Sequence, residues 1–243
     1  MTATGIVAAL AFEARSLGRS RGAAQAVTRL ADGSLIRISG IGPDKAARAA
    51  RELIDAGAGA LLSWGVAGGL DRALASGTAV VPGEVIWRPE GNGAAALRSF
   101  TTTPLWRERL LSQLQGHVRI AHGALFTGVT PVAVAASKAR LHADTRAVAV
   151  DMESAAIAEV AAAHALPFLA LRVVLDTASD SLPESLMRAF EPERPSWRPV
   201  ATTPADWPAL LRLARQYWRA RRSLGACARL SAGARNSPVE GGH

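Results

Sequence analysis

The sequence has little of several residue types, and each scarcity excludes a class of protein. A single cysteine, Cys227, excludes an internal disulfide framework. The five histidines show no metal-ligand spacing with one another or with the cysteine, so we expect no metal site. No apolar run approaches the ~18 residues of a membrane-spanning helix. The apolar N-terminus is short and interrupted by Glu13, which predicts a first strand, not a signal peptide, in a cytoplasmic protein.

Aromatic residues are also scarce, at 5%, whereas apolar residues reach 49% and many are alanine. Alanine favours helices, and 243 residues suffice for one large α/β domain. Lysine and arginine outnumber the acids by 28 to 20, and arginine concentrates toward the C-terminus. This balance fits an anionic partner such as a membrane surface, and equally an arginine-rich proteome. No stacking aromatics are interleaved with the basic residues, so we expect no nucleic-acid partner.

Apolar runs alternate with helical patterns along the chain. This predicts an α/β fold with three layers, α/β/α, around a mixed, mostly parallel sheet. We expect strands at residues 6–10, 35–39, 60–65, 79–81, 124–127, 147–150 and 168–175. Helices are expected from Pro43 to Gly57, from Thr130 to His142 and from Met152 to His164. Residues 89–93 predict a loop.

The composition changes after residue 182, where a predicted catalytic domain (1–182) ends. Residues 183–206 are rich in proline and predict an extended connector. Residues 207–230 predict a basic amphipathic helix, and 231–243 predict a flexible tail. Arginines lie beside the apolar stripe of this helix, which is formed by Trp207, Leu210, Leu211, Tyr217 and Trp218.

Polar or glycine-rich patches follow four of the predicted strands. They are Glu13, the segment Gly65-Val66-Ala67-Gly68-Gly69, the pair Met152-Glu153, and Asp176. Strand ends of a doubly wound sheet can converge on one crevice, so we interpret the four patches as one site.

Each patch alone has a structural alternative. Glu13 fits a solvated residue at a helix start, and the glycines fit an ordinary connection without a nucleotide-binding pattern. Met152 fits core packing, and Asp176 fits a helix cap. The site prediction therefore rests on the joint arrangement.

These residues, in order and spacing, resemble the purine and uridine phosphorylase superfamily, and within it the methylthioadenosine/S-adenosylhomocysteine nucleosidases. The resemblance covers about residues 5–181, and its specific parts are Met152-Glu153 and Arg172-Val-Val-Leu-Asp176. The connector and residues 207–215 look most like the hopanoid-associated branch. That narrower resemblance implies removal of adenine from adenosylhopane, a nucleoside that carries a polycyclic lipid.

The resemblance implies cleavage of a ribose N-glycosidic bond through an oxocarbenium-like transition state, with no cofactor. Asp176 would be the acid at the purine N7, kept protonated by an apolar surround to which Val173, Val174 and Leu175 contribute. Met152 and Glu153 would bind the ribose, and Glu13 would orient or deprotonate the attacking water. The segment beside the nucleophile or anion would be Gly65, Val66, Ala67 and Gly68.

Two positions depart from the family pattern. Val66 stands where a hydroxyl residue is usual, and Leu175 stands where a serine often precedes the catalytic aspartate. The arginine-bearing phosphate motif of true phosphorylases is not evident near Gly65. Water and phosphate as co-substrate therefore both stay open as the nucleophile; for phosphate, the candidate sources of charge are Arg15, Arg37 and Lys45.

We expect an enzyme that releases adenine from an adenosine-bearing lipid. A nucleosidase for small soluble nucleosides such as methylthioadenosine is the alternative, and an inactive scaffolding relative is a third interpretation. The helix at 207–230 would contact the inner membrane surface peripherally, or else pack on the α/β body or across a dimer. Homodimers are usual among the nucleosidases, so the resemblance also implies a homo-oligomer.

Overall fold

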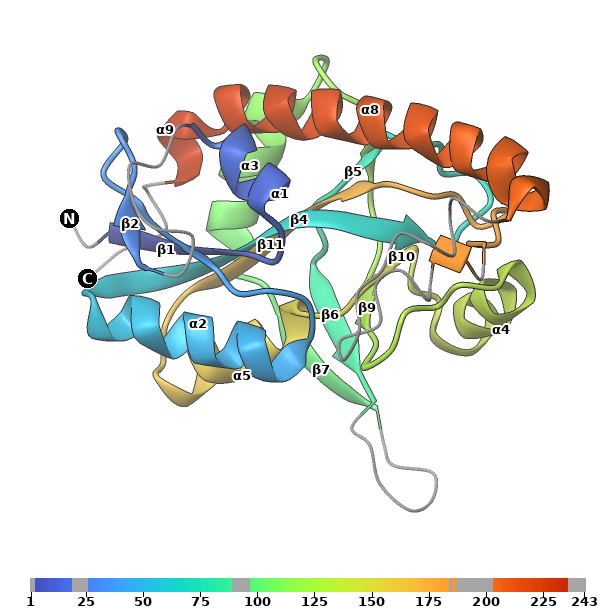
Figure 1. The fold of residues 1–243 in the computed structure, drawn as a ribbon. Coiled ribbons are helices and arrows are strands. Elements are labelled where there is room, and N and C mark those ends of the chain that lie inside the picture. The colour runs from blue at the N-terminus through green and yellow to red at the C-terminus, as the bar shows by residue number, and fades with distance from the viewer. Residues whose placement is uncertain (1–2, 19–25, 89–96, 184, 187–202, 236–243) are drawn as a thin grey trace.

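A central sheet lies between two layers of helices in the computed structural model, which describes residues 3–18, 26–88, 97–183, 185–186 and 203–235 (Figure 1). Helices α2 (Pro43–Asp55) and α5 (Ser154–Ala163) pack on one face. The other face is covered by α1 (Ala11–Ser16), α3 (Pro104–Leu114) and α8 (Trp207–Leu230). The predicted three-layer α/β/α fold with a C-terminal amphipathic helix is confirmed.

The sheet follows the order β2-β3-β1-β4-β10-β9-β6-β7, and β11, β5 and β8 branch from β4. Its first part contains β1 (Ala3–Ala8), β2 (Thr28–Arg29), β3 (Leu35–Ile38), β4 (Ala58–Gly69), β5 (Ala79–Val80), β8 (Ile120–Ala121) and β11 (Phe168–Val174). Its second part contains β6 (Glu84–Trp87), β7 (Arg98–Thr101), β9 (Leu125–Thr127) and β10 (Ala149–Asp151). Strands β3, β1, β4 and β11 are parallel, whereas β10 is antiparallel to the end of β4, so the sheet is mixed.

The central strands are apolar on both faces because helices cover both. In β1, Val7 packs in the cluster of α2 and α5, whereas its neighbours Ile6 and Ala8 pack in the cluster of α1, α3 and α8. Strands buried in this way appear in the sequence as continuous apolar runs, which is why these runs could be recognised.

Strand β4 is longer than predicted, so the glycine segment is part of a strand and not the connection given as its structural alternative. Val66 pairs in register with Val173 of β11, and Gly68 pairs with Val150 of β10. The glycines disfavour strand structure, so the pattern ended the predicted strand at Gly65. In the structure β4 continues to Gly69 and joins the two parts of the sheet.

The helix predicted to begin at Thr130 begins later, which is a second correction. Helix α4 spans Ala135–Thr145, and the Ser181 hydroxyl accepts a hydrogen bond from the Ala135 amide at its start. The residues before it, including Thr130 and Pro131, line a pocket instead. Helices α1 and α3 and strands β2, β6, β7 and β8 were not predicted. The expected loop at 89–93 and most of the connector at 183–206 lie outside the described residues.

The C-terminal part is anchored at its end. A 3-10 helix, η1 (Pro204–Asp206), leads into α8, and α9 (Ala232–Arg235) follows it. The Trp106 indole donates to the Ala234 carbonyl at 2.8 Å, and buried Arg235 pairs with Asp32 at 2.7 Å. Residues 231–235 therefore do not fit the predicted flexible tail, of which 236–243 lie beyond the described part.

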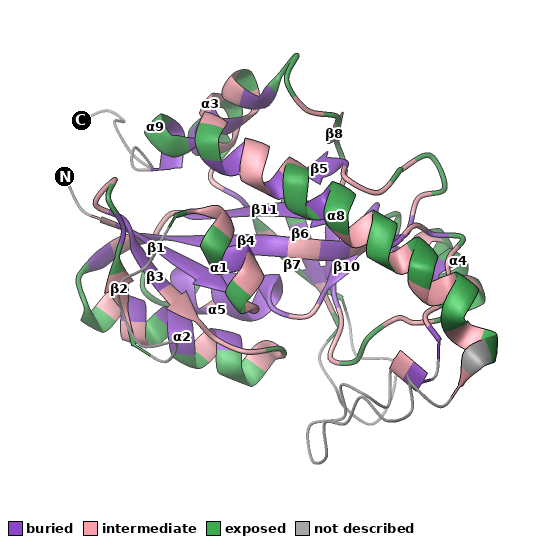
Figure 2. Cartoon of the chain, turned by 45° about the horizontal axis from the view of Figure 1, so that its top comes forward, coloured by how far each residue is buried: buried purple, intermediate pink, exposed green. Residues whose placement is uncertain are grey.

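Helix α8 is not covered evenly along its length (Figure 2). Ala220, Leu224 and Cys227 are buried in the core, whereas the half that begins at Trp207 is largely exposed. In the described ranges, no helix combines the length and the apolar character needed to cross a bilayer.

Candidate active site

One pocket lies where β1, β10 and β11 end and β4 crosses the sheet. It brings together the predicted acids Glu13, Glu153 and Asp176. Its lining consists of Ala9, Leu10, Glu13, Ile41, Val66, Ala67, Gly68, Thr130, Pro131, Val132, Val150, Asp151, Met152, Glu153, Leu175, Asp176 and Leu182. Of the four predicted patches, only Gly65 and Gly69 do not line it. The crevice at the carboxyl ends of strands is the usual ligand site of an open α/β sheet.

Glu13 is held in the first turn of α1, directly after β1. Its Oε1 accepts a hydrogen bond from the Val66 amide at 2.9 Å, and its Oε2 accepts one from the Leu10 amide at 2.8 Å. The side chain is buried, so the alternative of a solvated residue is wrong. Burial raises the pKa of Glu13, while Arg172 and the backbone amides oppose that shift.

Gly65 lies behind this carboxylate. A Cβ atom at this position would lie 2.3 Å from Glu13 Oε1 and 2.7 Å from Arg172 Nη1. Gly65 therefore serves the site by leaving space for the acid, and Val66, Ala67 and Gly68 form the wall of the pocket.

Met152 and Glu153 lie at the start of α5, and both line the pocket. Glu153 Oε1 accepts a hydrogen bond from the Gly42 amide at 3.1 Å, which ties α5 to the loop before α2. Burial raises the pKa of Glu153 to about 7; Arg172 lowers it, and Asp151 raises it further. This carboxyl therefore titrates close to neutral pH.

Arg172 is the central cation of the site, and sequence reasoning did not identify it as such. It is buried in the middle of β11, and its Nη2 lies 2.8 Å from Asp151 Oδ2 and 3.5 Å from Glu153 Oε2. The same Nη2 donates to the Ser63 hydroxyl at 2.7 Å. Arg172 thus neutralises part of the acidic cluster without lining the pocket itself.

Asp151 is a second residue that was missed. Its Oδ1 accepts a hydrogen bond from the Thr127 hydroxyl at 2.7 Å, and its carboxylate also accepts one from the Ser154 amide. Asp151 thus joins β9, β10 and the first turn of α5, so it fixes the backbone that carries Glu153.

Asp176 follows β11, and its surroundings differ from the apolar ones expected. The ammonium group of Lys138, on α4, forms an ion pair with Asp176 Oδ2, and the lysine side chain is fully buried. Burial raises the pKa of Asp176, and Lys138 opposes this shift without cancelling it. The protonated form is therefore favoured relative to a free aspartate, although a cation lies beside it.

The residues considered as sources of charge for phosphate do not line the pocket. Arg15 is exposed on α1, and Arg37 forms an ion pair with Glu52. Lys45 lies against the position that a Cβ on Gly40 would take. Within the described residues, no lysine or arginine contributes to the pocket lining.

The fold and this pocket define an α/β enzyme with a small-molecule site at its strand ends. Residues 7–195 match the Phosphorylase superfamily. The chain belongs to this superfamily and is an enzyme of the nucleosidase or phosphorylase type. No curated protein sequence matches the chain.

Solved structures share the fold over almost the whole chain. The 5'-methylthioadenosine/S-adenosylhomocysteine nucleosidase of Neisseria meningitidis has a TM-score of 0.71 at 19% identity, covering 96% of this chain and 99% of its own. The corresponding nucleosidase of Campylobacter jejuni gives 0.69 at 18% identity, with coverage of 96% and 99%. Futalosine hydrolase of Helicobacter pylori gives 0.69 at 16% identity, with coverage of 93% and 94%. Identities this low show a common fold alone.

Proposed function

We propose that the enzyme cleaves the N-glycosidic bond of an adenosine-containing hopanoid, adenosylhopane, and releases adenine. The observation that carries the reaction is that Glu13, Glu153 and Asp176 line one pocket. Their pKa values are raised chiefly by burial, a common property of catalytic carboxyls.

The three acids can divide the reaction among them. A protonated Asp176 would donate its proton to the purine N7 as the glycosidic bond breaks and negative charge moves into the base. Glu153 would accept hydrogen bonds from the ribose hydroxyls, with Met152 packed on the sugar. The carboxylates also stabilise the positive charge that develops on the ribose.

Water is the nucleophile that the pocket favours. Phosphate would enter a lining that offers carboxylates and, within the described residues, no cationic side chain. The Val66 amide already donates to Glu13, so it is engaged before any anion arrives. Glu13 would accept a proton from this water, and its position beside Val66 and Ala67 in the pocket lining supports that role.

The lipid substrate is supported by apolar residues near the pocket and along α8. The pocket lining includes Val132, Leu182 and Ile41, of which Ile41 is 40% exposed. An apolar lining of this kind suits a large apolar substituent on the nucleoside. The similarity to nucleosidase structures favours the alternative, a small soluble nucleoside such as methylthioadenosine.

We also propose that α8 binds the surface of a bilayer that contains anionic lipids, at the inner membrane surface. Trp207, Leu211 and Trp218 lie at helical spacing on one outward stripe and are 53%, 63% and 54% exposed. We name these three residues the outer stripe. Arginines flank it, and the Arg221 guanidinium lies 5.2 Å from the centre of the Trp218 ring.

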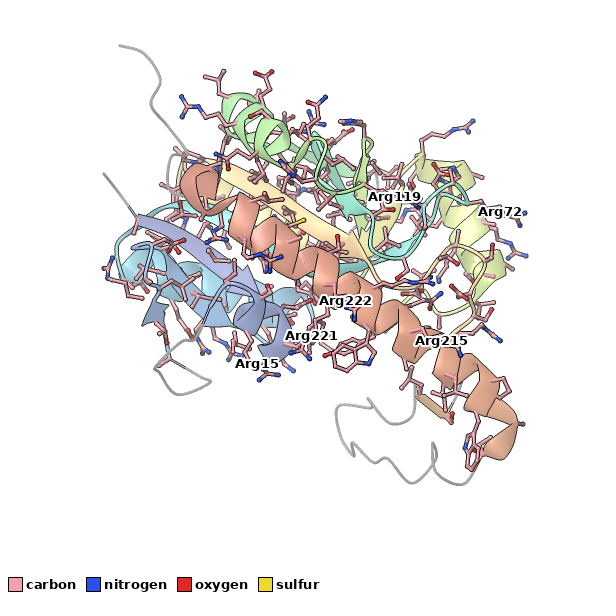
Figure 3. All side chains as sticks on the ribbon, turned by 90° about the horizontal axis from the view of Figure 1, so that it is seen from above. Arg15, Arg72, Arg119, Arg215, Arg221 and Arg222 are labelled. Atoms are coloured by element: carbon pink, nitrogen blue, oxygen red, sulfur yellow. The ribbon has the colours of Figure 1, made fainter. Side chains whose placement is uncertain are left out.

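The basic residues of this face come from α8, from α1 and from the segments that hold Arg72 and Arg119 (Figure 3). Arg215, Arg221 and Arg222 lie along α8, and Arg15 of α1 is on the same side (Figure 3). An apolar stripe with arginines beside it is the pattern of an interfacial helix. Two residues of the predicted membrane contact turn inward instead: Leu210 is half-buried, and Tyr217 packs edge-to-face on Phe12 with ring centres 5.1 Å apart.

The reaction is tested by mass spectrometry of products from adenosylhopane and methylthioadenosine, each with and without phosphate. We expect adenine and free ribosyl-hopane, with no phosphorylated sugar. Asp176→Asn should lower the rate about 100- to 10,000-fold, because it removes general acid catalysis. Phosphorylated sugar would refute hydrolysis, and adenine release from methylthioadenosine alone would replace the lipid with the soluble substrate.

Membrane binding is tested by sedimentation with anionic vesicles. Replacing the outer stripe by serine should reduce the bound fraction about tenfold or more, because three large apolar side chains no longer leave water. Leu105→Ser is the matched control, since Leu105 is 58% exposed but lies on α3. Equal vesicle binding by the wild type and the stripe variant would contradict the proposal. We also still predict that the protein forms a homo-oligomer, which a measurement of its mass by light scattering would test.

A further inference from the structure

We propose that Lys138 is a positioning residue for Asp176. The ammonium group of Lys138 holds one carboxylate oxygen of Asp176 and leaves the other oxygen for the purine. The inference rests on the proposed role of Asp176 as the acid of the reaction. Lys138 lies on α4, outside the pocket lining, and so would act only through the aspartate.

All three hydrogen-bond donors of the Lys138 ammonium group have acceptors. Its Nζ pairs with Asp176 Oδ2, and also donates to the Thr177 carbonyl at 2.9 Å and the Asp180 carbonyl at 3.0 Å. An ammonium group has three donors, and here each has an acceptor on the segment that follows β11. The side chain is 0% exposed, so water does not compete for these bonds.

Lys138 supplies a hydrogen-bond donor that the residue before Asp176 cannot supply. Leu175 stands where the superfamily often has a serine before the catalytic aspartate, and leucine cannot donate a hydrogen bond. In this chain the donor reaches Asp176 from α4 instead. A charged donor forms a stronger hydrogen bond than a hydroxyl, and its charge adds to the lowering of the carboxyl pKa that a hydrogen bond alone produces.

The other groups around Asp176 leave the lysine as the dominant electrostatic partner. Asp180 raises the pKa of Asp176, but its own carboxylate accepts hydrogen bonds from the Thr177 amide at 2.8 Å and the Gln216 side chain of α8 at 2.7 Å. From β4, the neighbours are Gly68 and Gly69, which carry no charge. Lys138 is thus the cation that opposes the effect of burial on Asp176.

The expected effect of removing the charge has a definite sign. A neighbouring cation favours the ionised carboxylate, so Lys138→Met should raise the pH at which Asp176 loses its proton by about one to three units. The carboxyl would also lose its fixed orientation. We therefore expect kcat to fall about tenfold or more even where Asp176 is protonated in both proteins.

The experiment measures the titration of Asp176 directly by infrared difference spectroscopy, using the carboxyl band that Asp176→Asn removes. Wild type is compared with Lys138→Met, Lys138→Gln and Lys138→Arg, each checked for folding by circular dichroism. Glutamine can still donate a hydrogen bond without charge, and arginine retains the charge. We expect the titration midpoint to rise in the methionine and glutamine variants and to stay near the wild-type value in the arginine variant.

The pH profile of kcat/KM for adenine release provides the second reading, and its basic limb should move with the infrared midpoint. Unchanged midpoints in the methionine and glutamine variants would overturn the proposal, as would full activity of these variants. If the wild type releases no adenine from any nucleoside, the proposed function fails, and the infrared titration still decides the role of Lys138.

Discussion

Arg172 forms an ion pair with Asp151 of the pocket lining, with 2.8 Å between Nη2 and Oδ2 and each side chain only 1% exposed. The pair joins β11 to the junction of β10 and α5. Glu153 and Glu13 also act on this arginine, so one guanidinium serves three buried acids. The acidic character of the pocket therefore depends on a cation that does not itself line the pocket.

Arg172→Met should strongly destabilise the protein, because three buried carboxyls would lose their common cation. We expect a loss of about 3–5 kcal/mol in the free energy of unfolding, measured by urea denaturation. The matched control is Arg98→Met, since Arg98 pairs with Glu159 at the surface, where both side chains are more than 40% exposed. That change should cost about 0–1 kcal/mol. Similar losses in the two variants would show that the buried cluster does not depend on Arg172.

The titration of Glu153 should make the stability of the protein depend on pH. Its pKa rises from the ordinary 4.5 to about 7 on folding, mainly through burial. Between these values the folded state keeps a proton that the unfolded state has released, so stability should fall as pH rises through this window. Glu153→Gln should flatten this fall in thermal unfolding curves. A slope unaffected by the substitution would assign the pH dependence to another group.

The same titration should control nucleoside binding if Glu153 holds the ribose. Its ionised form is the better acceptor for ribose hydroxyls. Affinity for a nucleoside, measured by calorimetry, should therefore increase as pH rises through about 7. Glu153→Gln should bind more weakly and without this pH dependence. An affinity that falls over this range would argue against the ribose contact.

The sequence was sufficient for the fold because the buried strands are continuous apolar runs. It was also sufficient to predict that Glu13 and Asp176 lie at one edge, because they follow the parallel strands β1 and β11. Glu153 reaches the same edge from β10, which pairs antiparallel with the end of β4. The glycines from Gly65 to Gly69 misled the strand prediction, since their low strand propensity hides the pairing that β10 and β11 provide.

The two cations of the site were harder to recognise. Arg172 gave a usable signal, because a single charge inside the seven-residue apolar strand β11 must be paired when buried. Lys138 gave none, since it lies in a helix with Arg140 and His142, where a charged residue normally faces solvent. Only the packing of α4 against the segment after β11 reveals its contact with Asp176.

The end of the chain should contribute to stability through Arg235. Its Nη1 donates to the Ala228 carbonyl at 2.6 Å, and its Nη2 pairs with Asp32. Arg235→Ala should cost about 1.5–3 kcal/mol in urea unfolding, because hydrogen bonds of a buried charged group are lost. Arg229→Ala, at an exposed position of α8, should change stability by no more than about 0.5 kcal/mol. If the two substitutions change the free energy of unfolding equally, residues 231–235 belong to the flexible tail as predicted from the sequence.

Position 65 should tolerate no side chain, because the carboxylate of Glu13 occupies the space that a side chain would need. In Gly65→Ala, the new Cβ would meet Glu13 Oε1 at 2.3 Å and Arg172 Nη1 at 2.7 Å, so both groups have to move. We expect a loss of about 1–3 kcal/mol in stability from overpacking. Adenine release should fall as well, since Glu13 would shift from the Val66 amide.

The matched control is Gly225→Ala in α8, where the nearest atom to a new Cβ would be Arg229 Nη1 at 3.7 Å. Alanine should stabilise this helical position by about 0.5–1 kcal/mol. The two alanine substitutions should thus change the midpoint of unfolding in opposite directions. If Gly65→Ala instead keeps wild-type stability and activity, then Glu13 has a second position available to it, and the close contact with β4 is not required for the reaction.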